Sequence, residues 1–411
     1  MPARLTLLCF LCTAFCSNIS AQQALDRSLT HDGIARSYIV YVPQAYTGDE
    51  AWPLIISLHG YTGTAQLQRL ISNFEALAGE ENFLLAYPQG LEIDDPSGGI
   101  LPALPPRGTG WNIRDPDGPD DLGFMEALMD SISAEFNIDP ARVFAAGHSN
   151  GGTLAYVMAC ELTGRIAAIA SVGGPGTSPG LVPFFVCNTS APTPVIHIHG
   201  TSDAVVPYTG VEGLFPPIPA LVESWGGFNG CAAGPVVTEI ADAGPQDGST
   251  ATLIQYLDCE QGAEVWHFRV NGGGHWWPGS IDVPPFLESV FGKTNRDFDA
   301  SREIWNFFTG QPATVTGLAQ PAGASPVAVT AFPNPFREEV SVVFRLQEAS
   351  GVRLRVYDPV GRPTAAPEEQ ALPAGLQKIQ WETPPHLPAG WYLLVLEVDG
   401  VPAGRQLVIR E

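Results

Sequence analysis

The sequence predicts an α/β fold, built on a doubly wound and mostly parallel sheet, followed by a small C-terminal β-sandwich. Apolar runs alternate with amphipathic segments over residues 22–311, which is typical of strands and helices that alternate along the chain. A linker at 312–328 is rich in Ala, Gly, Pro, Ser and Thr. After it, residues 329–411 hold short β-type runs separated by Gly, Pro and Asp turns.

Individual elements follow from their patterns. Seven apolar runs with little alternation predict strands buried on both faces: Tyr38–Val42, Leu54–Leu58, Phe83–Tyr87, Val143–Ala146, Ile166–Val172, Val195–His199 and Val265–Val270. Apolar residues at helical spacing predict three helices: Asp121–Phe136, Thr153–Leu162 and Ser301–Phe308. The C-terminal part has five β-type runs: Glu339–Leu346, Val352–Tyr357, Gln377–Trp381, Gly390–Val398 and Gly404–Arg410. Two long Gly/Pro-rich stretches, Gln89–Pro119 and Pro207–Pro219, predict loops that serve a site.

Composition narrows the class of protein. The chain has 411 residues, of which 45% are hydrophobic and 15% charged, so a large core can form and general disorder is excluded. The formal net charge is −23. An acidic surface repels phosphate backbones and anionic lipids, which disfavours nucleic acid and membrane surfaces as partners.

The first 21 residues predict a secretory signal. Arg4 supplies a positive charge, Leu5–Cys16 is largely apolar, and Ser20 and Ala21 are small residues suited to cleavage. The apolar stretch is too short for a membrane-spanning helix. No other part of the sequence has an apolar run that approaches the length of such a helix. We therefore expect a monomer without a transmembrane segment that is secreted, either extracellular or attached to the cell surface.

Four cysteines remain after the signal: Cys160, Cys187, Cys231 and Cys259. An even number in an exported protein predicts two disulfides, with three possible connectivities, and buried free thiols are the alternative. The local pairs Cys160–Cys187 and Cys231–Cys259 are favoured because they close short loops without crossing. The absence of a C-x-x-C pair argues against a zinc or redox site.

A candidate nucleophile lies in the sequence Gly147-His-Ser-Asn-Gly151, which follows one predicted strand and precedes a predicted helix. A tight strand-to-helix turn that presents a serine needs small residues two positions before and after it. Ser149 is therefore predicted to be catalytic. An ordinary Gly-rich connection is the alternative.

Serine needs an imidazole to take its proton and an acid to orient that imidazole. Asp203 follows a buried strand, and His275 follows another through a flexible run of glycines. The order Ser149, Asp203, His275 is the one expected of an α/β-hydrolase. The competing base is His267. Three other acids are weaker candidates because no strong buried run precedes them: Glu239, Asp242 and Asp247.

Two backbone amides are needed to bind the oxyanion of the tetrahedral intermediate. The amide of Asn150, directly after the nucleophile, is one candidate, and that of Tyr61, in the loop after the strand Leu54–Leu58, is the other. Trp111, Trp276 and Trp277 are predicted to form a stacking surface for an aromatic or sugar-bearing substrate, although core packing explains Trp277 equally well.

The motifs resemble those of the polyhydroxybutyrate depolymerase and feruloyl esterase family. They cover residues 30–310 in family order: Leu58-His-Gly-Tyr-Thr-Gly63, Ala86-Tyr-Pro-Gln-Gly90, Gly110-Trp-Asn112, Asp120-Asp-Leu-Gly-Phe124, Asn137-Ile-Asp-Pro-Ala-Arg-Val143, Gly147-His-Ser-Asn-Gly-Gly152, Ile198-His-Gly-Thr-Ser-Asp203 and Gly273-Gly-His-Trp-Trp-Pro-Gly279. The resemblance implies a carboxylester hydrolase with the triad above and the same two local disulfides. Trp276 stands where the family often has threonine, which leaves the substrate preference open.

The C-terminal region resembles the type IX secretion sorting domain of Bacteroidetes-like bacteria. The matching motifs are Ala331-Phe-Pro-Asn-Pro-Phe336, Val356-Tyr-Asp358 and Leu387-Pro-Ala-Gly-Trp-Tyr392. This resemblance implies that the secretion machinery is a partner. A carbohydrate-binding module is the rival interpretation, because small β-sandwiches host many functions.

Taken together, the residues predict a secreted serine carboxylesterase, without cofactor or metal, that acts on plant-polysaccharide acyl esters or on polyesters. A catalytically inert, surface polysaccharide-binding protein on a hydrolase scaffold is the alternative, and a peptidase finds less support. Four acids, Asp115, Asp117, Asp120 and Asp121, form a cluster for which calcium binding is one interpretation. A solvated loop with Asp121 as helix N-cap is the favoured one.

Overall fold

The structure is a computed structural model that describes most of the chain. The described residues are 23–101, 104–113, 115–179, 187, 189, 191–285, 287–313, 327, 329–358, 363–364, 367, 369–384 and 387–411. The predicted signal at 1–21 and most of the predicted linker at 312–328 lie outside them.

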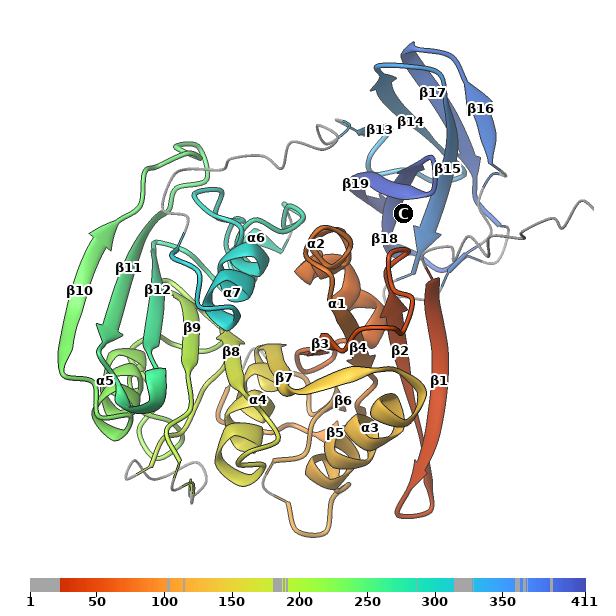
Figure 1. The fold of residues 1–411 in the computed structure, drawn as a ribbon. Coiled ribbons are helices and arrows are strands. Elements are labelled where there is room, and N and C mark those ends of the chain that lie inside the picture. Colours follow the sequence, from red (N-terminus) through yellow and green to blue (C-terminus); the bar gives the residue numbers. More distant parts are fainter. Residues whose placement is uncertain are drawn as a thin grey trace, which may run out of the picture.

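One large sheet forms the centre of the first part of the chain (Figure 1). Its strands in spatial order are β1 (Gln23–His31), β2 (Ile34–Val42), β4 (Leu84–Pro88), β3 (Trp52–Leu58), β7 (Ile138–His148), β8 (Ala168–Val172), β9 (Val195–Gly200), β12 (Val265–Asn271), β11 (Thr250–Leu257) and β10 (Ala233–Glu239).

The sheet is mixed rather than mostly parallel. The central strands, from β4 to β12 in spatial order, are parallel to one another. Antiparallel strands extend both edges, with β1 and β2 on one side and β11 and β10 on the other. The doubly wound parallel prediction therefore describes the centre of the sheet, and the antiparallel edges correct it.

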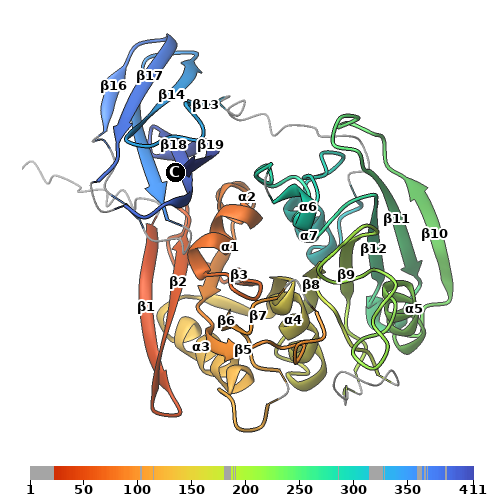
Figure 2. The same ribbon diagram turned by 180° about the vertical axis from the view of Figure 1, so that it is seen from behind.

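Helices cover both faces of this sheet (Figures 1 and 2). One face packs against α3 (Asp121–Glu135), α4 (Asn150–Glu161) and α5 (Ile218–Phe228). The other face packs against α1 (Ala65–Ser72), α2 (Phe74–Glu81) and α7 (Ala300–Phe308). This is the layered arrangement of an α/β-hydrolase-type fold.

Alternation along the strands divides the core between the two faces. In β3, Leu54, Ile56 and Leu58 face the α3 and α4 side, whereas Ile55 faces the α2 and α7 side. Because both faces are covered, the whole strand is apolar, which is why such runs were recognisable in the sequence.

Shorter elements lie in the connections. The loop Gln89–Pro119 contains a two-stranded ribbon of β5 (Leu91–Asp94) and β6 (Arg107–Gly110). A 3-10 turn, η1 (Glu260–Gly262), precedes β12, and α6 (Glu288–Phe291) precedes α7. In the part of the chain that the structure describes, no helix has both the length and the apolar character needed to cross a membrane.

Disulfides join Cys160 to Cys187 and Cys231 to Cys259. Both local pairs favoured by the sequence are thereby confirmed. The first ties the end of α4 to the segment before β9, and the second ties the segment after α5 to the end of β11.

The last part of the chain forms two smaller antiparallel sheets. One contains β13 (Thr330–Phe332), β14 (Glu339–Leu346) and β17 (Gly375–Glu382), and the other contains β16 (Gln370–Leu372), β15 (Ser350–Tyr357), β18 (Gly390–Val398) and β19 (Val401–Arg410). Side chains from both sheets, including Val342, Leu354 and Trp381, form one buried cluster. This cluster shares no residue with the two clusters of the large sheet.

Candidate active site

Ser149 occupies the sharp turn between β7 and α4. Its backbone has a φ of 52° and a ψ of −120°, a conformation that non-glycine residues rarely adopt. The turn is so tight that a Cβ on Gly147 would lie 2.2 Å from the carbonyl carbon of Gly151. A Cβ on Gly151 would in turn lie 2.5 Å from the carbonyl oxygen of His59. The two glycines therefore permit the strained turn that the motif predicts.

Asp203 and His275 meet at the ends of neighbouring strands. Asp203 follows β9 and His275 follows β12, which are paired in parallel, so their carboxyl ends lie at the same edge of the sheet. The Nδ1 of His275 lies 2.7 Å from Oδ2 of Asp203, and both residues are buried. This is the acid–imidazole contact expected from the sequence order.

The carboxylate of Asp203 accepts further hydrogen bonds. Its Oδ1 accepts from the backbone amides of Val205 at 2.8 Å and Val206 at 2.7 Å. His199 Nε2 lies 3.3 Å from Oδ2 and also donates to the carbonyl oxygen of Val206 at 2.9 Å. Burial alone would raise the pKa of Asp203, but the charge of His275 and the hydrogen bonds from His199 and His275 hold that pKa well below its ordinary value.

Ser149 and His275 lie near each other, but their side chains form no hydrogen bond. The amide of Ser149 donates to the carbonyl of Val172 at 2.8 Å. A Cβ on the next residue, Gly173, would lie 3.1 Å from Nδ1 of His275. The ring of His148 lies 4.9 Å from that of His275. In enzymes without bound substrate, the serine–histidine bond is often long and forms only in the complex.

Other groups considered from the sequence are engaged elsewhere. His267 lies in β12, with Nδ1 2.9 Å from the carbonyl oxygen of His197 and Nε2 2.9 Å from the hydroxyl of Tyr208. Glu239 accepts from Thr252, and Asp247 accepts from the amide of Arg296. His267, Glu239 and Asp247 therefore have local structural partners.

The amides of Tyr61 and Asn150 are free of protein hydrogen bonds among the described residues. The neighbouring amide of Thr62 donates to Thr109. Asn150 opens α4, where the first N–H groups have no partner within the helix. A Cβ on Gly60 would lie 3.1 Å from the Cβ of Ser149, so the loop carrying Tyr61 closely approaches the nucleophile.

His148 is a second imidazole beside the base. Burial, reinforced by the charge of His275, lowers the pKa of His148 to about 3, so its ring is neutral at physiological pH. A neutral ring packed against His275 fills space there without adding a competing charge. The sequence motif showed His148 only as the variable position of the turn, with no signal for this contact.

A pocket opens beside Ser149 and has a volume of about 400 Å³, part of which is open to solvent. Two of its lining residues, Asn150 and Thr153, lie on α4, and the others come from the connections between elements. The lining residues are mainly apolar: Tyr61, Pro96, Ser97, Leu101, Leu104, Ser149, Asn150, Thr153, Pro175, Val205, Val206, Leu214 and Phe215. Both Gly/Pro-rich loops predicted to serve a site contribute to it. The individual aliphatic residues were not recognisable because loops lack a periodic pattern.

None of the three predicted substrate-binding tryptophans lines this pocket. Trp111 is fully buried and donates through Nε1 to the carbonyl oxygen of His59 at 2.7 Å. Trp277 is buried on the other face of the sheet and donates to Ser301 at 3.0 Å. The prediction of a stacking surface is corrected for both, because their rings have no solvent-facing area to offer.

Trp276 is half-buried beside the base. Its ring packs against Phe291, with 5.6 Å between centroids, and it helps to line a separate small cavity that also contacts His199 and Gly273. It therefore forms an aromatic wall near His275 rather than a wall of the pocket at Ser149.

The acidic cluster separates into different structural roles. Asp121 forms a buried ion pair with Arg36 and accepts from the amide of Asn112 at 2.6 Å. Asp120, rather than Asp121, caps α3 by accepting from the amide of Gly123 at 2.9 Å. The predicted N-cap is thus displaced by one residue.

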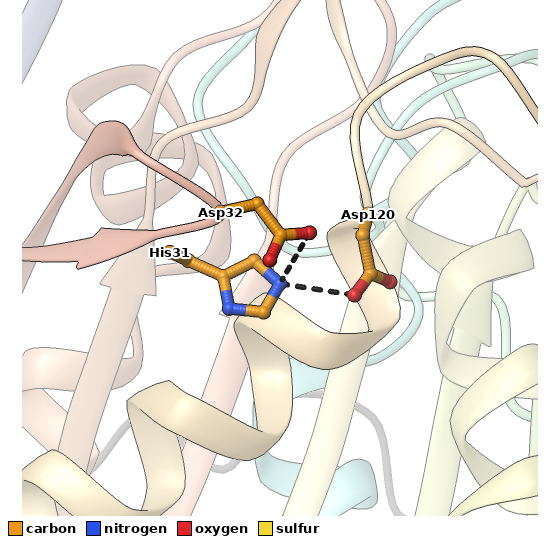
Figure 3. Close-up of side chains that lie close together, drawn as sticks. All are labelled: His31, Asp32 and Asp120. Atoms are coloured by element: carbon orange, nitrogen blue, oxygen red, sulfur yellow. Dashed lines mark hydrogen bonds and ion pairs between the residues drawn. The ribbon is translucent and has the colours of Figure 1, made fainter.

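Figure 3 shows Asp120 with His31 and Asp32, the three side chains that point toward one another at the β1–β2 turn and the start of α3. His31 Nε2 lies 3.0 Å from Asp120 and 3.7 Å from Asp32. Calcium takes about six to eight oxygen ligands. The described residues bring only these two carboxylates to the imidazole, so a hydrogen bond between His31 and Asp120 fits this cluster better than calcium.

The chain has relatives among known esterases. Residues 33–184 match the model of the Esterase family, described as "Putative esterase". The chain is 29% identical over 258 residues to a bifunctional acetylxylan esterase/xylanase of Neocallimastix patriciarum, covering 63% of this chain and 33% of that protein. It is 29% identical to feruloyl esterase B of Piromyces equi, covering 58% and 42%. It is 27% identical to feruloyl esterase D of Neurospora crassa, covering 68% and 83%.

The match thus spans about a third of the Neocallimastix protein's length and less than half of the Piromyces protein's. Among solved structures, an acetyl xylan esterase from Aspergillus awamori is similar with a TM-score of 0.43 and 16% identity, covering 60% of this chain and 90% of that one. The family match and the sequence relatives together support a carboxylic ester hydrolase.

Proposed function

We propose that the chain is a secreted serine carboxylesterase in which Ser149, His275 and Asp203 act as nucleophile, base and acid. The observation that carries the proposal is the 2.7 Å contact between His275 and Asp203, set beside the strained turn that presents Ser149. The similarity to feruloyl and acetylxylan esterases supports the same reaction class.

The mechanism follows from the hydrogen-bond directions. An ionised Asp203 can only accept, so Nδ1 of His275 carries the proton and its Nε2 is left as the base. That nitrogen takes the proton of Ser149 as the hydroxyl attacks the ester carbonyl, and the amides of Tyr61 and Asn150 bind the oxyanion. His275 then protonates the leaving alcohol, and the same imidazole activates the water that releases the acid.

The pocket beside Ser149 favours an apolar acyl group. Leu101, Val206 and Phe215 lie on its walls, and apolar walls suit an apolar acyl group. A feruloyl-type aromatic acid on plant polysaccharide offers an apolar ring to these walls. A hydroxyalkanoate polyester, as in polyhydroxybutyrate, is the second candidate, because its aliphatic units match the same walls.

For residues 329–411 we propose a β-sandwich that directs export through type IX secretion. Support comes from the sequence resemblance and from two antiparallel sheets that share one buried cluster. Deleting the segment should abolish export while esterase activity on a soluble substrate persists. Loss of binding to polysaccharide or polymer, with export intact, would instead indicate a binding module.

A substrate panel tests the reaction and its acyl preference. Purified protein is assayed on p-nitrophenyl acetate, methyl ferulate, acetylated xylan and polyhydroxybutyrate film, together with labelling by a fluorophosphonate probe. We expect hydrolysis of methyl ferulate with a higher kcat/KM than that of p-nitrophenyl acetate. Absence of both turnover and labelling would indicate the inert binding protein instead.

Variants identify the nucleophile. Ser149→Ala should abolish both turnover and probe labelling. Ser131→Ala is a matched control because Ser131 lies on α3 and its hydroxyl bonds to the hydroxyl of Tyr38. The control should keep wild-type activity, and labelling that persists in Ser149→Ala would overturn the assignment.

A further inference from the structure

Trp111 makes hydrogen bonds to both sides of the candidate oxyanion hole. Its indole Nε1 donates to the carbonyl oxygen of His59 at 2.7 Å, two residues before Tyr61. Its backbone amide donates to Oδ1 of Asn150 at 2.7 Å, and its carbonyl oxygen accepts from Nδ2 of the same side chain at 3.1 Å. One buried residue thus connects the two segments whose amides are free.

The residues around Trp111 are closely packed. A Cβ on Gly110 would lie 2.9 Å from the ring of Tyr61 and 3.0 Å from Oδ1 of Asn150. The segment 110–111 is therefore packed against both donor residues at once. The ring of Trp111 itself is fully buried against His59, with 4.7 Å between their centroids.

The side chain of His59, whose carbonyl oxygen bonds Trp111, is itself held by hydrogen bonds. Its Nδ1 lies 2.8 Å from the carbonyl oxygen of Gly60, which can only accept, so Nδ1 carries the proton. Its Nε2 then accepts from the amide of Gly90 at 2.9 Å. Burial lowers the pKa of His59 to about 4, which keeps this neutral tautomer over the working pH range. These bonds fix the position of His59, whose carbonyl oxygen accepts the hydrogen bond from Trp111 Nε1.

We propose that Trp111 is a positioning residue that sets the separation of the Tyr61 and Asn150 amides and so prepares the oxyanion hole before substrate binds. The inference rests on the proposed function. Amide donors contribute most when they already lie where the charge develops, because no energy is then needed to reorganise them. Without the hydrogen bond from Trp111 to His59, the protein would still bind substrate, but the loop that carries Tyr61 would stabilise the transition state less.

Trp111→Phe tests this role by removing the indole N–H while keeping an aromatic ring. We expect kcat on p-nitrophenyl acetate to fall about 10- to 100-fold, since losing one oxyanion donor entirely lowers kcat about 100- to 1000-fold. KM should change less than about threefold. Affinity for phenylboronic acid, which forms a tetrahedral adduct with the serine, should fall by the same factor as kcat. The pH profile of kcat/KM should stay unchanged because the base and acid are untouched.

Trp305→Phe is the matched control. Trp305 is also buried, but its Nε1 has no hydrogen-bond partner among the described residues, so the substitution removes the same atoms without breaking such a bond. We expect its kcat to stay within about twofold of wild type. A Trp111→Phe variant that behaves like this control, or one that shifts the pH profile, would overturn the positioning role.

Asn150→Ala provides a second test, and it decides the matter if Trp111→Phe fails to fold. It retains the backbone amide but removes both side-chain bonds to Trp111. The same loss of kcat and of boronate affinity is expected, and the double variant should lose less than the product of the two single effects. Unchanged kcat in Asn150→Ala would refute the proposal. If the wild-type protein itself lacks turnover and probe labelling, the proposed function fails instead.

Discussion

Replacing Asp203 by asparagine separates the electrostatic role of the acid from its structural role. In the native protein, Oδ1 accepts from the amides of Val205 and Val206, while Oδ2 faces His275 and His199. The carbonyl oxygen of an asparagine can keep the two amide bonds. Its NH₂ group must then face two imidazole N–H donors, an arrangement that no hydrogen bond can satisfy.

The size of the effect follows from this conflict. His275 relieves it by moving its proton to Nε2, and the nitrogen that should take the Ser149 proton is then already protonated. Loss of the correct tautomer lowers kcat about 10⁴-fold, which corresponds to about 5.5 kcal/mol of transition-state stabilisation. His199 keeps its hydrogen bond to the carbonyl oxygen of Val206 at 2.9 Å in this variant. The free energy of unfolding should therefore fall by only about 1–3 kcal/mol.

Two further variants make the measurement specific. Asp203→Ala should lose kcat to a similar extent but should also lower the unfolding free energy further, because two buried amides lose their acceptor. Asp297→Asn is the matched control: Asp297 is buried and accepts from the amides of Ala243 and Gly244, away from the candidate triad. The assays are p-nitrophenyl acetate turnover and urea unfolding. An Asp203→Asn variant that keeps more than about 1% of wild-type kcat would refute this reasoning.

Three further predictions concern stability and the pocket. Burial lowers the pKa values of His59 to about 4 and His148 to about 3, below the 6.5 of unfolded histidine. The unfolded state therefore binds more protons, and the unfolding free energy should fall as pH drops from about 6.5 toward 4, by up to about 1.4 kcal/mol per pH unit for each ring; equal stability in urea at pH 7 and pH 5 would contradict this. Phe215→Ala should raise KM for methyl ferulate at least about fivefold more than KM for p-nitrophenyl acetate, because it removes an apolar wall; equal changes would argue against an acyl pocket. Replacing Cys160 and Cys187 by alanine should cost about 3.5 kcal/mol in urea unfolding, from the 27-residue separation of the pair; an unchanged unfolding midpoint would contradict it.

The strands at the centre of the sheet were predictable because burial on both faces makes their sequences uniformly apolar. The runs at Leu54–Leu58 and Val195–His199 fall within β3 and β9 for this reason. Three antiparallel strands at the edges of the sheet, β1, β10 and β11, were missed. In β10, Val236 and Val237 are exposed and a proline interrupts the run, so the segment lacks the signature of a buried strand.

The candidate triad was predictable to the extent that it depends on chain order and local motifs. Ser149 has a tight-turn motif, and Asp203 and His275 each follow a strong buried run, so sheet topology brings the last two together. Trp111 and Trp277 were misassigned because a tryptophan close to a motif in sequence carries no sign of which way its ring faces. The pocket wall at Leu101 and Phe215 depends on loop tertiary structure, which has no periodicity to read.

The hydrogen bonds from Val205 and Val206 to Asp203 have a consequence for how this protein can change. The same two residues line the pocket beside Ser149 and donate from their backbone amides to Asp203. Side-chain exchanges there can alter substrate range while leaving the amides in place. Insertions, deletions or a proline at either position would disturb selectivity and reactivity together. Directed evolution of acyl preference should therefore accumulate point substitutions at 205 and 206, and length variation should be confined to loops such as the one carrying Leu101.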